Sequence, residues 1–152
     1  MKIITPNNVK IFSSAFHGVL AGVVVLALLL MISYGYTHEL LILWGSSVAC
    51  GSYFGWGLGS WYVPIKGERL YFEPYVVTPI ISLLSALVSG LLFMFTTEVT
   101  ASAENMFNLG SVFGGGIFIG LYAFVLTLPV TAIVGGAVAL YLYKFGGYQN
   151  QL

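Results

Sequence analysis

The chain has 152 residues, of which 59% are hydrophobic and only 7% are charged, and its formal net charge at pH 7 is zero. A soluble globular domain usually carries about 25% charged residues, so this chain has too few charges to cover a surface that faces water. The composition predicts an integral membrane protein, and the lack of net positive charge argues against nucleic acid as a partner.

The first half of the chain contains two predicted membrane-spanning helices. The hydrocarbon core of a bilayer is about 30 Å thick and needs roughly 20 apolar helical residues to cross it. Uncharged stretches of this length cover about residues 11–34 and 40–63. Residues 35–39 then form a short outer loop between them, and residues 64–77 form a cytoplasmic loop after the second.

The third predicted span covers about residues 78–97. Thr78 is the expected N-cap, because a threonine side chain can accept a hydrogen bond from the exposed N–H groups of the first turn. Pro79 is the expected first helical residue, where the missing N–H of proline costs nothing.

The last uncharged stretch ends at Lys144 and leaves two interpretations open. In one, an outer loop over residues 98–116 precedes a single helix over about residues 117–143, kinked at Pro129. In the other, Pro129 is the turn between two separate spans. The first is favoured, because the segment that follows the proline is short for a crossing.

The basic residues indicate the orientation of these four spans. In this arrangement all five fall on one side of the membrane, and the positive-inside rule makes that side cytoplasmic; they are Lys2, Lys10, Lys66, Arg69 and Lys144. Trp61 and Tyr62 are then expected at the inner headgroup level. The predicted fold is an all-α integral membrane protein: one membrane domain, residues 1–152, with four helices in a compact bundle and both termini cytoplasmic. The expected location is the cell inner (cytoplasmic) membrane.

Small residues recur at every fourth position of the first two spans, in the pattern of a glycine zipper. Within lipid, helices associate through close contact, which small side chains permit. One interpretation is that these faces pack the helices of a single monomer together. The other is that the face on the second span binds a partner, which would be another membrane protein or a second copy. The residues concerned are Gly18, Gly22, Gly51, Gly55 and Gly59.

A second set of polar residues lies within the spans. Ser82, Ser85 and Ser89 share one side of the third span and are candidates for the polar lining of a path, together with His17 of the first span. The alternative for His17 is a helix-packing histidine, hydrogen-bonded to a backbone carbonyl or a serine. A pH-sensing or ligand-binding role is the sharper hypothesis for this imidazole.

Charged residues gather only in the cytoplasmic loop. Lys66, Glu68, Arg69 and Tyr71 form a candidate docking loop, because loops carry recognition and Arg and Tyr are favoured at contact hot spots. The alternative is that the loop only sets the topology and anchors the chain at the interface.

The sequence offers little that would support catalysis. Every charged residue lies at or beyond a predicted helix end, and the single Cys50 excludes an intrachain disulfide or a cysteine cluster for metal. We expect no enzyme activity, no cofactor and no metal. The function expected is lateral helix-helix binding to another membrane protein, in an immunity, exclusion or accessory-subunit role. The alternative is a homo-oligomeric channel or carrier for ions or small solutes.

Overall fold

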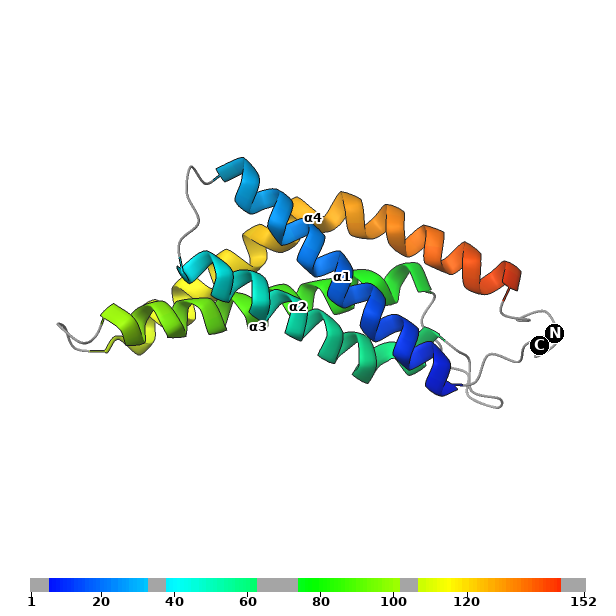
Figure 1. The fold of residues 1–152 in the computed structure, drawn as a ribbon, viewed down its shortest axis with the longest axis horizontal. Coiled ribbons are helices and arrows are strands. Elements are labelled where there is room, and N and C mark those ends of the chain that lie inside the picture. The colour runs from blue at the N-terminus through cyan, green and yellow to red at the C-terminus, as the bar shows by residue number, and fades with distance from the viewer. Residues whose placement is uncertain (1–5, 33–37, 63–73, 102–106, 146–152) are drawn as a thin grey trace.

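The computed structural model describes residues 6–32, 38–62, 74–101 and 107–145, and almost all of them are helical. Successive helices run in opposite directions and lie side by side along most of their length (Figure 1). The elements in chain order are α1 (Pro6–Ile32), α2 (His38–Leu58), a short 3-10 helix η1 (Gly59–Tyr62), α3 (Pro74–Ala101) and α4 (Leu109–Phe145).

Three of these helices are long and apolar enough to cross a bilayer: Asn8–Ala27 within α1, Tyr75–Thr100 within α3 and Leu109–Val138 within α4. The prediction of an all-helical membrane protein is confirmed to this extent. α2 has 21 residues and is the shortest of the four long helices. Its sequence is rich in glycine and serine, which lower its hydropathy but let its neighbours approach closely.

The helices pack in chain order, α1 on α2, α2 on α3 and α3 on α4. The remaining seam, between α1 and α4, is not closed by helix packing, and α1 has only marginal contact with α3. The molecule is therefore two tightly packed hairpins, α1 with α2 and α3 with α4, joined through α2 and α3. This arrangement leaves α1 and α4 without packed contact along one side of the bundle.

α3 begins earlier than the sequence predicts. Its first residue is Pro74, and Pro79 lies inside the helix. The predicted N-cap at Thr78 is wrong: this residue is fully buried and helical, and its hydroxyl is hydrogen-bonded to the hydroxyl of Tyr62. Pro74 takes the place at the start of the helix that proline tolerates best.

α4 also begins earlier than expected, at Leu109, so the predicted outer loop over residues 98–116 is wrong at both of its ends. Asn108 caps the helix, because its side-chain oxygen accepts hydrogen bonds from the N–H groups of Gly110 (2.9 Å) and Ser111 (3.3 Å). Glu98, at the end of α3, accepts hydrogen bonds from the Asn108 N–H and the Ser111 hydroxyl. Its negative charge lies at the positive end of the helix dipole.

Pro129 lies inside α4 and does not divide it, so the interpretation with one continuous helix is confirmed. In Figure 1 the two halves of α4 run in different directions, as expected where proline removes one backbone hydrogen bond and crowds the preceding turn. With 37 residues the helix is about 55 Å long, well above the thickness of the hydrocarbon core.

Candidate functional site

The seam between α1 and α2 is built on glycine. A Cβ atom added at Gly51 would lie 2.7 Å from the carbonyl oxygen of His17, and one added at Gly55 would lie 2.6 Å from that of Ser13. No side chain larger than hydrogen fits at either position without moving the backbone of α1. The two helices therefore pack backbone to backbone, as small residues permit in membrane helices.

The other three glycines of the predicted zipper lie in the same seam. Cβ atoms added at Gly18, Gly22 and Gly59 would all lie within 3 Å or so of the facing element. Two side-chain hydrogen bonds cross the seam, from the Trp44 indole N–H to the Gly22 carbonyl (3.0 Å) and from the Ser14 hydroxyl to the carbonyl of Ser52 (3.0 Å). α1 covers the glycine face of α2, so a partner helix has no room to bind there.

A hydrogen-bonded network closes one end of the bundle. Ser13, His17, Tyr62 and Thr78 are each at most 2% exposed, and they come from α1, η1 and α3. The Tyr62 Oη lies 3.1 Å from His17 Nε2 and 2.8 Å from the Thr78 hydroxyl oxygen. His17 Nδ1 lies 2.8 Å from the Ser13 carbonyl oxygen, which can only accept a hydrogen bond. This contact makes Nδ1 a donor.

The direction of the whole network follows from that contact when the imidazole is neutral. With the proton on Nδ1, Nε2 is an acceptor and the Tyr62 hydroxyl donates to it. The Thr78 hydroxyl then donates to the Tyr62 oxygen. His17 has the contacts expected of a helix-packing histidine, a backbone carbonyl and a serine, with a buried tyrosine in addition.

Sequence reasoning missed the role of Tyr62, which it placed at the headgroup level. A tyrosine at the end of an apolar segment usually anchors the interface, so the sequence pattern alone favours that position. The structure instead buries Tyr62 in an apolar cluster of residues from α1, η1, α3 and α4: Val9, Tyr62, Val77, Ile81 and Val138. We call these residues, with Ser13, His17 and Thr78, the closed end.

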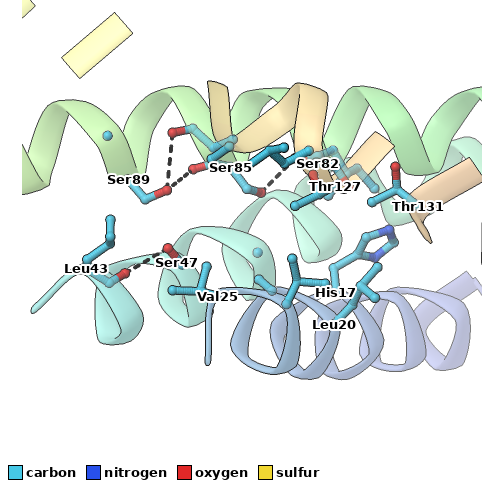
Figure 2. Close-up of a pocket in the computed structure, with 18 of the residues that line it drawn as sticks. His17, Leu20, Val25, Leu43, Ser47, Ser82, Ser85, Ser89, Thr127 and Thr131 are labelled. Atoms are coloured by element: carbon cyan, nitrogen blue, oxygen red, sulfur yellow. Dashed lines mark hydrogen bonds between the residues drawn. The ribbon is translucent and has the colours of Figure 1, made fainter. Parts of the chain in front are cut away.

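Beside the closed end lies a cavity of about 180 Å³ that receives side chains from all four long helices. The predicted polar residues His17, Ser82, Ser85 and Ser89 all line it, and Figure 2 shows the three serines of α3 facing Ser47 of α2 across the space. The remaining lining is mostly aliphatic: Leu20, Ala21, Val24, Val25, Leu43, Ile81, Ala86, Ile119, Ala123 and Leu126.

Most of the hydroxyl groups that line the cavity donate hydrogen bonds to backbone carbonyls of their own helices. Ser47 donates to the Leu43 carbonyl and Ser85 to the Ile81 carbonyl, both at 2.7 Å, and Ser89 donates to the Ser85 carbonyl one turn before it. Thr127 and Thr131 of α4 do the same with carbonyls three residues earlier. Each of these hydroxyl hydrogens is used in a bond to a backbone carbonyl, so the wall that the side chains form is less polar than the sequence suggests.

The cavity contains no charged side chain among the residues that the structure describes. No carboxylate, lysine or arginine lines the cavity, and no three His, Cys, Asp or Glu side chains come together among the described residues. The predicted docking loop, with Lys66, Glu68, Arg69 and Tyr71, lies outside the residues that the structure describes.

The outward side of α4 is the second candidate surface. Among the described elements, α4 packs extensively only against α3. Only 11% of its apolar segment is buried, against 28% for the segment in α1 and 33% for the segment in α3. Phe118, Val125 and Ile133 are each more than 60% exposed. Cβ atoms added at Gly114 and Gly136 would meet nothing within 4 Å.

No protein-family model, curated protein or solved structure matches this chain. The fold defines the class, an all-helical membrane protein with a small-residue seam between α1 and α2 and a cavity lined by all four long helices.

Proposed function

We propose that this chain is a four-span protein of the cell inner (cytoplasmic) membrane with both termini cytoplasmic. α2 packs against both α1 and α3, and its 21 residues give a length of about 31 Å, enough for the hydrocarbon core. The start of α1 and the end of α4 lie at the same end of the bundle (Figure 1). The five basic residues support the cytoplasmic assignment of that end.

We further propose that the protein acts by lateral helix-helix binding to another membrane protein rather than by catalysis. Such binding suits an immunity, exclusion or accessory-subunit role, in which a compact bundle blocks or stabilises its target. The observation that carries the proposal is the uncovered side of α4, the longest helix and the one with the smallest buried share of its apolar segment. The open positions at Gly114 and Gly136 would let a partner helix approach its backbone closely.

The test is photocrosslinking in the native membrane. A photoreactive amino acid replaces Val125, which is 63% exposed on α4, or Val112, which is 5% exposed on the same helix. The proposal predicts one foreign membrane protein crosslinked in stoichiometric yield from position 125 and none from position 112. Lipid adducts alone from position 125 would contradict it.

A matched pair of glycine variants locates the contact. Gly114→Leu adds a side chain where the monomer has open space, so the fold should stand while the partner is lost. Gly57→Leu, on the uncovered side of α2, also meets nothing in the monomer and should keep the partner. Equal crosslinking in both variants would place the contact elsewhere.

The second candidate function is a carrier for a small solute, either as a monomer or within a homo-oligomer. It is favoured by the meeting of Ser82, Ser85 and Ser89 in one central cavity, a place where small-molecule sites occur between bundle helices. The hydroxyls that donate to their own backbone weigh against ions. In liposomes, a carrier predicts solute uptake that Ser85→Leu abolishes, and the absence of uptake for any solute tested would contradict it.

A further inference from the structure

The cavity is larger than the voids that packed protein interiors contain. Protein interiors are packed as densely as organic crystals and contain few voids larger than a water molecule. At about 180 Å³ the cavity exceeds an engineered apolar cavity of about 150 Å³ that binds benzene. A space of this size within a stable bundle needs an occupant or will lose the contacts along its walls.

Water is a poor occupant for this space. A buried water molecule needs two to four polar partners. Ser47, Ser85 and Ser89 already donate to carbonyls of their own helices, so their hydroxyl oxygens can only accept a hydrogen bond from a water molecule. Both ring nitrogens of His17 are engaged in the closed end. Among the lining hydroxyls within the described ranges, those of Ser82 and Tyr122 make no hydrogen bond, and Tyr122 is 56% exposed.

The position of the cavity indicates what can enter it. Leu20 and Val24 line it from α1, Ala123 and Leu126 from α4, and Ala86 from the floor on α3. α1 and α4 do not pack against each other beside it, and all five residues lie within the segments long and apolar enough to cross a bilayer. The opening between α1 and α4 therefore faces the hydrocarbon core of the membrane, where the solvent is lipid chain.

We propose that this cavity is a binding site for one hydrocarbon chain of a membrane lipid, which enters sideways between α1 and α4. By comparison with the benzene cavity, it takes a segment of roughly seven carbon atoms, and the rest of the chain lies in the opening. The closed end blocks the space beyond His17 and fixes how far the chain can enter. The site is separate from the outward side of α4, so it can exist whether or not a protein partner binds there.

Two alanines of α4 supply a matched pair of variants. Ala123 lines the cavity, whereas Ala132 is exposed on the same helix and does not line it. Ala123→Phe fills the space with an aromatic ring, and Ala132→Phe places the same ring in the surrounding lipid. Val24→Phe fills the cavity from the opposite wall and serves as the second filling variant. Thermal unfolding in detergent establishes that each variant is folded.

The experiment is native mass spectrometry after reconstitution in vesicles of phosphatidylethanolamine and phosphatidylglycerol and gentle extraction in detergent. The wild type and Ala132→Phe should retain one lipid per monomer, and retention should fall at least tenfold in Ala123→Phe and in Val24→Phe. No retained lipid in the wild type, or equal retention in all folded variants, would overturn the proposal. If neither filling variant folds, a spin label on the lipid chain is used with the wild type instead. The proposal predicts an immobilised component in the spectrum, and a spectrum from mobile chains alone would overturn it.

Ser82→Ala separates a hydrocarbon site from a polar-solute site. A hydrocarbon chain makes no hydrogen bond to the Ser82 hydroxyl, so lipid retention in this variant should remain within about twofold of the wild type. A fall as large as that of Ala123→Phe would show that the occupant carries a polar group, which would overturn the hydrocarbon assignment.

Discussion

The closed end and the cavity both contain buried polar side chains, but only at the closed end do these side chains form hydrogen bonds between different elements. At the closed end, Tyr62 links His17 to Thr78, and these buried polar groups satisfy one another across three elements. In the cavity, the hydroxyls of Ser85 and Ser89 donate to carbonyls of their own helix rather than to a group on another helix. A polar side chain in a membrane helix links two helices only when a polar group of the second helix lies within hydrogen-bond distance. Otherwise its hydroxyl donates to the backbone of its own helix and adds little polarity to the surface.

The largest expected effect concerns the glycine seam that holds α1 against α2. Gly55→Leu puts a side chain where a Cβ atom would already lie 2.6 Å from the Ser13 carbonyl oxygen. We expect the free energy of unfolding in bicelles to fall by about 3 kcal/mol, a large overpacking cost. Gly57→Leu, on the same helix but in open space, is the control and should stay close to the wild type. Equal stability of the two variants would show that α1 does not cover the glycine face.

The next effect tests the network of the closed end. Tyr62→Phe removes the hydroxyl that joins His17 and Thr78, and it leaves their buried groups with fewer partners. We expect a loss of about 1 to 2 kcal/mol in the free energy of unfolding, measured by steric trapping. Tyr53→Phe is the matched control because Tyr53 is 75% exposed. If both substitutions lower the free energy of unfolding by the same amount, the hydrogen bonds of Tyr62 do not stabilise the closed end.

A smaller effect is expected at the cap of α4, which lies far from both regions. Asn108→Ala removes the acceptor for the Gly110 and Ser111 N–H groups and should cost about 1 kcal/mol. Asn108→Ser keeps an acceptor at the cap and should restore most of this loss. The midpoint of thermal unfolding in detergent measures both, and a serine variant as unstable as the alanine variant would argue against capping.

The smallest effect sharpens the description of the cavity wall. Ser89→Ala removes a hydroxyl that donates only to its own helix, so the free energy of unfolding should change by less than about 0.5 kcal/mol. Its lipid retention in native mass spectrometry should also stay at the wild-type level. A large loss of stability would mean that this hydroxyl has a partner across the cavity, as Tyr62 has at the closed end.

The sequence predicted the existence of the helices better than their ends. Uncharged stretches locate them because the bilayer imposes a length and an apolar composition. The start of α3 was misplaced because Pro74 and Pro79 are equally plausible first residues by type, and only packing decides between them. The start of α4 had a signal in Asn108, an N-cap residue followed by an apolar run, which the sequence interpretation did not use.

The sequence predicted several residues that line the cavity, but it did not predict how the helices are arranged around them. The spacing of Ser82, Ser85 and Ser89 places them on one side of α3, and the structure brings them into one cavity with His17. The sequence could not show that α1 and α4 fail to close over them, because this depends on how the two hairpins meet. Small residues at every fourth position are compatible both with close helix packing and with a cavity wall. The glycine seam is an example of the first, and the serine face of α3 is an example of the second.

The central question for this bundle is whether lipid chains reach its interior. Magnetisation transfer from lipid chain protons to labelled methyl groups, measured by solid-state NMR in bilayers, can compare Ala86 on the cavity floor with Val77 at the closed end. If a lipid chain occupies the cavity, magnetisation should reach the Ala86 methyl at the rate seen for the lipid-exposed Ala132, with little or none reaching Val77. Equal, slow transfer to Ala86 and Val77 would show that no lipid chain enters between α1 and α4.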